Sequence, residues 1–295
     1  MPEYRKLREK QSLWHLFHTP ELAAQVTLLP IDILNVDAAI LFSDILVVAE
    51  ALGGTVHFPE GKSPHIEMGP QFLFQPEVLH YVPETIRLLK PQLKVPLIGF
   101  CGGPFTVASY ILEEIKKSIY KDAQSLHELL EKITTATIAY LHMQIEAGVD
   151  AIQIFDSWAN LLTHEEFHQF SYPYLKKILA SLNIPTILFC RGSCILAEDL
   201  ATLNPTCISF DSHKPLAHMR KTIQPPIAVQ GNLDPYLLYA PKQVIIQKTQ
   251  ELLRSMQSDP GFIVNLGHGI FPDIPVDHVK CFVDQVLEFS PSVCL

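Results

Sequence analysis

Continuous runs of apolar residues recur along this chain, and most of them end on a polar residue or on glycine. Runs of this length without polar alternation are typical of strands buried on both faces, as in a parallel sheet covered by helices. We predict seven strands, at about residues 38–43, 96–100, 151–155, 186–190, 206–210, 227–230 and 262–266. An eighth strand is expected either within Gly53 to Phe74 or outside this chain. We otherwise interpret Gly53 to Phe74 as a long loop over the mouth of a barrel.

Segments with helical spacing of apolar residues alternate with these runs. Ser125 to Glu146 has this spacing, and Gly148 is expected to stop the helix. Thr163 to Glu166 predicts a capping box that opens a helix continuing to Leu179. A further helix is predicted over 241–256, with proline near its first turn. The alternation of strands and helices predicts repeated βα units.

Composition agrees with one large folded core. The 295 residues are 48% hydrophobic and 18% charged, which argues against disorder. We therefore predict a single α/β domain over residues 1–295, a distorted (β/α)8 barrel of the TIM type. The formal net charge of -9 argues against nucleic acid as a partner.

Cysteine usage and the charged N-terminus point to a reducing compartment. The first six residues carry charges unsuited to a signal peptide. The uncharged run from Val95 to Leu112 is broken by Gly102-Gly103-Pro104, which fits a strand, a loop and a helix better than a membrane span. We expect a cytoplasmic protein, not associated with a membrane, with reduced thiols. Its six cysteines are scattered and include no CxxC pair: Cys101, Cys190, Cys194, Cys207, Cys281 and Cys294.

Candidate functional residues stand where the predicted strands end, which is the active-site face of such barrels. Asp44 follows the first strand, either as a site residue or as a cap of the next helix. Ser157 follows the third strand without a GxSxG elbow, so a hydrogen-bonding role is expected rather than a nucleophilic one. His268 lies between two glycines that let backbone or ligand come close, which favours a functional role.

Two further features remain open on sequence alone. Tyr110 follows the Gly102-Gly103-Pro104 turn by about two helical turns, and without a function its ring would pack in the core with its hydroxyl at the rim. The turn itself lacks both GxGxxG and a P-loop lysine, so it supports a nucleotide site only weakly. His164 to His168 matches HExxH, a zinc pattern, but Thr163 places it in a first helical turn and no third ligand follows at metzincin spacing. We therefore expect no metal site.

Six segments, taken together, resemble the uroporphyrinogen decarboxylase family. The resemblance implies a distorted (β/α)8 barrel, usually a homodimer, that converts uroporphyrinogen III to coproporphyrinogen III without a cofactor by turning four acetate side chains into methyl groups. The segments span the chain in order: Met1-Pro2-Glu3-Tyr4-Arg5, Leu41-Phe42-Ser43-Asp44-Ile45-Leu46, Gly102-Gly103-Pro104-Phe105-Thr106 with Tyr110, Gln153-Ile154-Phe155-Asp156-Ser157, Gln230-Gly231-Asn232-Leu233-Asp234-Pro235 and Asn265-Leu266-Gly267-His268-Gly269.

The resemblance also implies residue roles. Asp44 is expected to bind the pyrrole N–H groups and to stabilise the positive charge that forms when a ring carbon is protonated. Tyr110, Ser157 and His268 are expected to hydrogen-bond or orient the substrate's carboxylates, and Arg8 matches a further basic position of the family.

The chain departs from the family at its start. The family reads Arg-Gln-Ala-Gly-Arg-Tyr just before the segment matched by Met1 to Arg5, and we expect that an N-terminal segment with these arginines is missing from this chain.

Two alternatives to the decarboxylase stay open. The first is a zinc-dependent corrinoid or thiol methyltransferase of the same superfamily, but its His-x-Cys is Leu188-Phe189-Cys190 here and His268 stands near its later cysteine, so the zinc set is incomplete. The second alternative is a porphyrinogen-binding barrel without catalytic activity.

Overall fold

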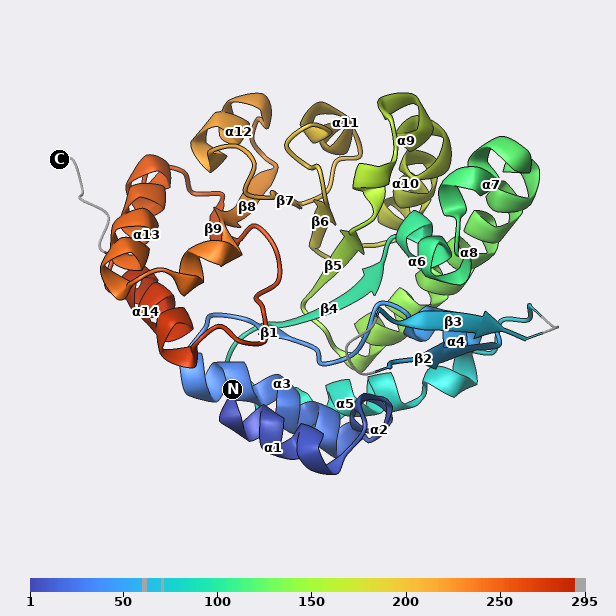
Figure 1. Ribbon diagram of the computed structural model, residues 1–295, viewed down its shortest axis with the longest axis horizontal. Coiled ribbons are helices and arrows are strands. Elements are labelled where there is room, and N and C mark those ends of the chain that lie inside the picture. Colours follow the sequence, from blue (N-terminus) through green and yellow to red (C-terminus); the bar gives the residue numbers. More distant parts are fainter. Residues whose placement is uncertain (60–62, 70–71, 290–295) are drawn as a thin grey trace. The chain divides into compact units, whose positions relative to one another are not determined.

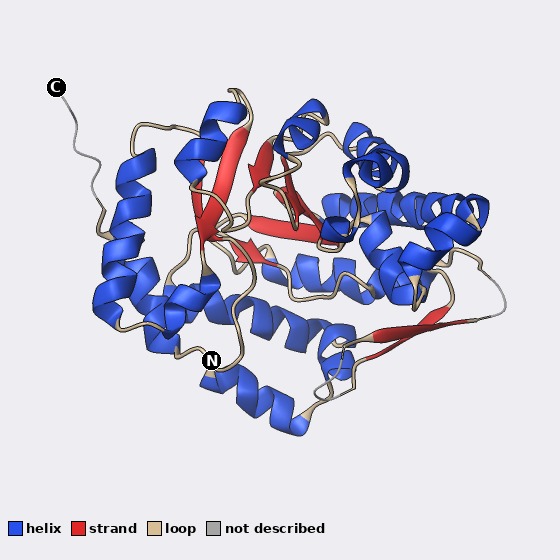
Figure 2. Cartoon of the chain, turned by 45° about the horizontal axis from the view of Figure 1, so that its top comes forward, coloured by secondary structure: helices blue, strands red, loops and turns tan. Residues whose placement is uncertain are grey.

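The computed structural model describes residues 1–59, 63–69 and 72–289, shown as a ribbon in Figure 1 and by secondary structure in Figure 2. The chain divides into two compact units. Unit 1 comprises Met1–Ile33 and Asp37–Thr186, and unit 2 comprises Leu34–Val36 and Ile187–Leu295. The prediction of one domain over 1–295 stays a prediction.

Unit 1 is built on three parallel strands, β1 (Ala39–Ile40), β4 (Leu97–Gly102) and β5 (Ala151–Asp156), with β4 paired to both neighbours. Ala39 lies opposite Leu97, and Ile98 lies opposite Ala151. The α-helices of this unit are α1 (Pro2–Lys10), α2 (Leu13–His18), α3 (Pro20–Leu34), α4 (Val47–Ala51), α5 (Tyr81–Leu89), α6 (Pro104–Ile111), α7 (Ile115–Lys121), α8 (Ala123–Ala147), α9 (His164–Phe170) and α10 (Tyr172–Ala180), with short 3-10 turns η1 (Pro76–Leu79) and η2 (Ala159–Leu161).

Unit 2 continues the same pattern, because β7 pairs in parallel with β6 and β8, and β8 with β9. A core cluster that includes Leu238, Ile245 and Phe282 joins the two helices α13 and α14, which lie side by side in Figure 1. The strands are β6 (Thr186–Cys190), β7 (Cys207–Ser209), β8 (Ala228–Leu233) and β9 (Phe262–Leu266); the helices are α11 (Ala197–Thr202), α12 (Leu216–Thr222), η3 (Pro235–Tyr239), α13 (Lys242–Met256) and α14 (Val276–Leu287).

All seven predicted strands are present. β6 and β7 are buried throughout, whereas the residues of β9 are partly buried or exposed. The predicted helix over 241–256 is α13, and the helix predicted from Ser125 is α8. The side chain of Asp122 accepts a hydrogen bond from Ser125 N at the start of α8, and Gly148 ends it with φ of 113°. Glycine adopts this left-handed conformation without strain, which is why the helix stops there.

The helix predicted from Thr163 to Leu179 is wrong in one respect. The capping box between Thr163 and Glu166 is confirmed, but the helix ends at Phe170 and a second one, α10, begins at Tyr172. Ser171 interrupts the run with φ of -123°, and its hydroxyl donates to Asp156 instead of lying on a continuous helix. Pro173 at the start of α10 cannot donate the backbone hydrogen bond that a continuous helix requires.

The described residues of the stretch Gly53 to Phe74 include no eighth parallel strand, but they do include regular structure within the expected loop. Its described residues form an antiparallel pair, β2 (Gly54–His57) and β3 (His65–Met68), in a separate two-stranded sheet. Val56 and Ile66 from this pair are buried against Leu46 and Ala49. Figure 2 shows the two strands apart from the parallel strands of unit 1. Residues 60–62 and 70–71 of the stretch lie outside the described residues.

None of the described helices is long and apolar enough to cross a membrane. The five described cysteines carry reduced thiols, and four of them are buried; Cys294 lies outside the described residues.

Candidate active site

A buried carboxylate, Asp156, joins the carboxyl ends of β4 and β5 in unit 1. Its Oδ1 accepts a hydrogen bond of 2.6 Å from Thr106 Oγ1, and its Oδ2 accepts one of 2.5 Å from Ser171 Oγ. A Cβ on Gly103 would lie 2.7 Å from Asp156 Oδ1, so only glycine fits against this carboxyl group. Desolvation raises the pKa of Asp156 despite the hydroxyl donors. Thr106, Ser171 and Gly103 therefore hold in place the corner that precedes Ser157.

Tyr110 and Ser157 are brought to this same corner. Trp158 N donates to Thr106 Oγ1 at 3.0 Å, which holds the residue after Ser157 against α6. The Tyr110 ring, one turn further along α6, meets the Trp158 ring edge-on with centroids 6.0 Å apart. Tyr110 also packs against the cluster that contains Leu46. Tyr110 therefore packs against a core cluster while its side chain is only partly buried.

Asp44 lies in the turn between β1 and α4, beside the end of β4. Its Oδ1 accepts a hydrogen bond of 2.8 Å from Leu46 N, and the structure gives α4 no side-chain cap. Ile45 approaches β4 so closely that a Cβ on Gly102 would lie 3.1 Å from its Cβ. Desolvation raises the pKa of Asp44 to about 6, the Leu46 hydrogen bond opposes this, and the charge of Glu50 adds to it. Asp44 is a poorly solvated carboxylate with a single hydrogen-bond donor among the described residues.

The sequence did not point to Glu50, whose charge acts on Asp44. Glu50 on α4 accepts a hydrogen bond of 3.1 Å from Tyr81 OH and lies 2.9 Å from His18 Nε2. Burial lowers the pKa of His18, but its hydrogen bond and charge interaction with Glu50 outweigh burial, so the net shift is upward. Glu50 stands among the buried apolar residues of the short helix α4, and nothing in the local sequence pointed to a function for it.

Arg8 is on α1, and within the described residues no hydrogen bond or ion pair joins it to Asp44, Tyr110 or Ser157. Its Nη1 donates to Gln11 O at 2.9 Å, and its side chain lines a groove of about 340 Å³ together with Phe58 and residues 9–13. Its role in substrate binding stays a prediction.

His268 of unit 2 is paired with an arginine from the loop after β6. Arg191 Nη2 lies 2.8 Å from His268 Nε2, and the Phe189 ring meets the imidazole edge-on at 6.0 Å. Desolvation and the neighbouring Arg191 charge lower the pKa of His268, against one opposing hydrogen bond with Gly269. The imidazole is therefore neutral near pH 7, and its Nε2 accepts from the guanidinium.

Asp211, which sequence reasoning did not single out, fixes the loop that carries Arg191. Its carboxylate accepts hydrogen bonds from Gly192 N at 2.9 Å, Ser193 Oγ at 3.2 Å and His213 Nδ1 at 2.8 Å. Desolvation alone would raise the pKa of Asp211, but hydrogen bonds from Cys194 and His213 hold it below its usual range. Asp211 directly follows the apolar run 206–210, which is the same signal that identified Asp44.

Close backbone approach explains one of the two glycines beside His268. A Cβ on Gly267 would lie 2.6 Å from Ser212 N, whereas a Cβ on Gly269 would meet nothing within 4 Å. Gly267 therefore lets the loop after β9 rest on the loop after β7.

The HExxH segment is used for helix capping. Glu166 accepts from Thr163 N at 2.7 Å and from Tyr120 OH at 2.7 Å, and it pairs with Lys116. Desolvation acts against its ionised form, yet these partners lower the pKa of Glu166 to about 2. His164 and His168 lie on the exposed first turns of α9 with ring centroids 4.7 Å apart. Glu166 thus completes the cap of α9, as the position of Thr163 predicted.

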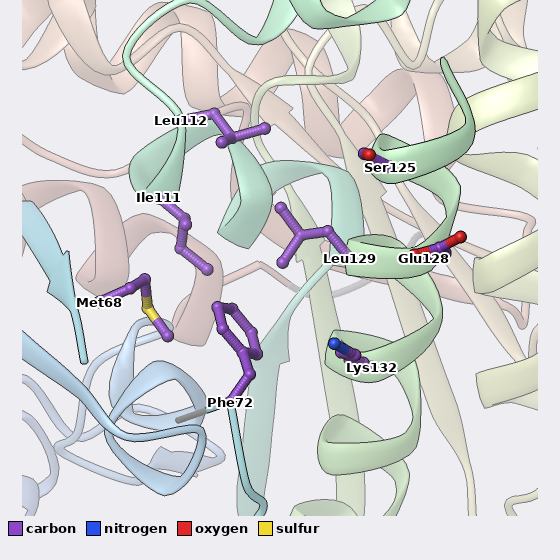
Figure 3. Close-up of a pocket in the computed structure, with 8 residues that line it drawn as sticks. All are labelled: Met68, Phe72, Ile111, Leu112, Ser125, Glu128, Leu129 and Lys132. Carbon is purple, nitrogen blue, oxygen red and sulfur yellow. The ribbon is translucent and has the colours of Figure 1, made fainter. Parts of the chain in front are cut away.

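A cavity of about 390 Å³ lies between α6, α8 and β3, and Figure 3 shows the side chains of Met68, Phe72, Ile111 and Leu129 gathered around it. Lys132 at its edge places Nζ 5.2 Å from the centre of the Phe72 ring. Asp44, Tyr110 and Ser157 do not line this cavity, so it is separate from the corner described above.

Comparison with known proteins identifies the relatives of this chain. The family model "Uroporphyrinogen decarboxylase (URO-D)" matches residues 1–289. A uroporphyrinogen decarboxylase of Protochlamydia amoebophila is 50% identical, covering 98% of this chain and 84% of that protein. One from Chlorobaculum parvum is 39% identical, covering 98% of this chain and 90% of that protein.

A solved structure, a methyltransferase from Methanosarcina mazei, has a TM-score of 0.80 and 25% identity, covering 92% of this chain and 86% of its own. This likeness, together with the parallel strands and alternating helices of both units, confirms the predicted α/β fold of the TIM-barrel type.

Proposed function

The chain belongs to the uroporphyrinogen decarboxylase family, and from this membership we propose that the Asp44 carboxylate is the centre of its chemistry. The chain is a carboxy-lyase that converts uroporphyrinogen III to coproporphyrinogen III in porphyrin and haem biosynthesis. The observation that carries the proposal is the state of Asp44: a carboxylate withdrawn from water, with pKa raised to about 6 and a single donor, at the end of β1.

The reaction needs a group that stabilises a positive charge on a pyrrole. A proton adds to a ring carbon next to the acetate-bearing carbon, and the ring becomes cationic. The bond between the acetate methylene and its carboxylate then breaks, CO₂ leaves, and the electron pair neutralises the ring. A second proton on the methylene carbon gives the methyl group, and the first proton is lost from the ring. An anion held against the pyrrole N–H groups lowers the barrier for this sequence.

Asp44 fits that task because it is desolvated before the substrate arrives. A carboxylate poorly solvated by water interacts more strongly with N–H donors and with a nearby positive charge than a solvated one does. Above pH 6 it is mostly ionised, so it accepts hydrogen bonds from the pyrroles. Its interaction strengthens as the ring becomes cationic, which is the condition for stabilising a transition state rather than only binding substrate.

We propose that the remaining predicted residues bind the carboxylates of the substrate. In unit 1 these are Tyr110, Ser157 and Arg8. In unit 2 His268 acts with Arg191, whose guanidinium supplies N–H donors in the planar arrangement that suits carboxylates. The substrate's negative charge and the chain's net charge of -9 repel each other, so local cations must supply the attraction.

The methyltransferase alternative is less favoured. The relatives that cover nearly the whole chain are uroporphyrinogen decarboxylases. His268, which stands near the position of a zinc-binding cysteine in that alternative, is already engaged by Arg191.

We also propose that the chain works as a homodimer in the cytoplasm, on the strength of the family resemblance. Sedimentation equilibrium and cell fractionation measure these two properties directly.

Asp44→Asn tests the proposed function. Asparagine keeps an oxygen for the Leu46 hydrogen bond but cannot carry the charge, so we expect coproporphyrinogen formation to fall about 100- to 1000-fold with the fold intact. Product is measured by chromatography after oxidation to porphyrins, and folding by circular dichroism. Near-normal turnover by a folded Asp44→Asn variant would overturn the proposal.

A further inference from the structure

The hairpin formed by β2 and β3 has one face in a core and one face rich in histidine. Val56 and Ile66, which lie opposite each other, are buried. The neighbouring pairs, Thr55 with Glu67 and His57 with His65, point to the other face, because side chains alternate along a strand. The hairpin therefore presents two histidines directly across from each other with a carboxylate diagonal to one of them.

The three possible ligand groups lie at distances that suit one metal ion. One ligand atom from each of His57, His65 and Glu67 lies within 4.8 Å of the other two. His57 Nε2 is 3.5 Å from Glu67 Oε2, and two ligands of a tetrahedral zinc ion are about 3.3 Å apart. The two imidazole rings are nearly parallel, with centroids 4.8 Å apart.

A second observation points to a ligand at the same place. His57 Nε2 is shielded from solvent and has no hydrogen-bond partner among the described residues. An imidazole nitrogen that neither water nor protein satisfies carries a free-energy penalty, and coordination of a metal ion removes it. The contact with Glu67 at 3.5 Å is too long to serve as a hydrogen bond.

We propose that His57, His65 and Glu67 form a binding site for a divalent transition-metal ion, with Zn²⁺ as the best fit. Two imidazoles and one carboxylate are a zinc-type ligand set, and water supplies the fourth position. The ion links β2 to β3 across their outer face, while Val56 and Ile66 hold the inner face. Bound ion therefore stabilises the hairpin. The site takes no part in the decarboxylation argued for Asp44.

Isothermal titration calorimetry of the full chain with ZnCl₂ tests the site. We expect one Zn²⁺ per chain at micromolar affinity, weakened about 100-fold or more by His57→Ala or His65→Ala and about tenfold by Glu67→Gln. The matched control is His80→Ala, which removes another exposed histidine of unit 1 and leaves binding unchanged. Thr55→His adds a fourth ligand on the same face, and we expect it to tighten binding about tenfold or more.

Two further readouts keep the test decisive. Co²⁺ bound at this site gives a visible spectrum without a thiolate charge-transfer band, which excludes the cysteines. Zn²⁺ raises the melting temperature of the wild-type chain but not of His57→Ala. Absence of stoichiometric binding, or binding that His57→Ala and His65→Ala both leave unchanged, overturns the proposal; circular dichroism confirms that each variant is folded.

Discussion

Asp44 and Asp156 of unit 1 and Asp211 of unit 2 stand at the ends of strands, but their surroundings shift the pKa of the carboxyl group in opposite directions. In unit 1, desolvation dominates, and the pKa values of Asp44 and Asp156 are raised. In unit 2, donors surround Asp211 and its pKa is lowered. The ionised form is thus disfavoured at the ends of β1 and β5 and favoured at the end of β7.

The number of donors distinguishes a carboxylate that can interact with a ligand from one that holds a loop in place. Both carboxylate oxygens of Asp211 accept hydrogen bonds, and these bonds hold the loop that carries Arg191. Asp44 has one backbone donor, so its charge remains available to a ligand. Asp156 is intermediate: it is desolvated but has two hydroxyl donors, which suits a residue that positions Ser157 and Trp158 without touching substrate. The proposed function assigns the reaction to Asp44, the carboxylate of the three with the fewest donors.

The largest effect is expected from removing the buried carboxylate of unit 1. Asp156→Ala leaves the hydroxyls of Thr106 and Ser171 without their acceptor and opens space beside Gly103. We expect a loss of about 2 to 4 kcal/mol in the free energy of unfolding, measured by urea denaturation. The exposed Asp273→Ala serves as control and changes stability by less than about 0.5 kcal/mol. An Asp156→Ala variant as stable as wild type would contradict the role given to Asp156.

A smaller effect is expected from filling the space against that carboxylate. Gly103→Ala places a Cβ 2.7 Å from Asp156 Oδ1, and we expect it to destabilise the chain by about 1 to 3 kcal/mol. Gly269→Ala in unit 2 is the matched control, because its Cβ meets nothing within 4 Å. Equal melting temperatures for the two variants would show that the corner of unit 1 is not tightly packed.

The raised pKa of Asp44 predicts a pH dependence with a definite sign. An unfolded aspartate titrates near 3.9, whereas Asp44 titrates at about 6 in the fold. Its contribution to stability is present below about pH 4 and is lost as the pH rises to about 6. We therefore expect Asp44→Asn to gain about 1 to 2 kcal/mol relative to wild type across this window, after allowing for partial exposure. Activity of the wild type falls as the pH drops below 6. A stability difference that does not vary between pH 4 and 7 would contradict the assigned pKa.

The smallest effect is expected in unit 2, where the pair is exposed. His268→Gln and Arg191→Lys should each raise KM about tenfold, because each weakens the hold on a substrate carboxylate. The double variant should fall short of the product of the two effects, since both residues act on one group. Melting temperatures should stay near the wild-type value. A large loss of stability with unchanged KM would make the pair structural.

Sequence patterns predicted the secondary structure correctly where residues close together in the chain determine it. Apolar runs predicted the strands, and Gly148 and Thr163 were correctly predicted as a helix stop and a helix cap. The β2–β3 hairpin was missed because its buried positions, Val56 and Ile66, are separated by a stretch rich in glycine, proline and histidine. The break at Ser171 was missed because one of its causes is a hydrogen bond to Asp156, 15 residues away, and because the local signal, Pro173, was not used.

The sequence by itself determined that polar residues stand at the ends of buried strands, since hydrophobic burial sets the strands and leaves their ends at the surface of the core. It identified Asp44, Tyr110, Ser157 and His268 as candidates, and the comparisons show their family. Only the tertiary structure decided how each group is charged. The partners that set these charges are distant in the chain: Thr106 lies 50 residues from Asp156, and Arg191 lies 77 residues from His268. Desolvation and the number of hydrogen-bond donors depend on such packed neighbours. The local sequence around a strand-end aspartate therefore does not show whether residues of the fold or a ligand will supply its hydrogen-bond donors.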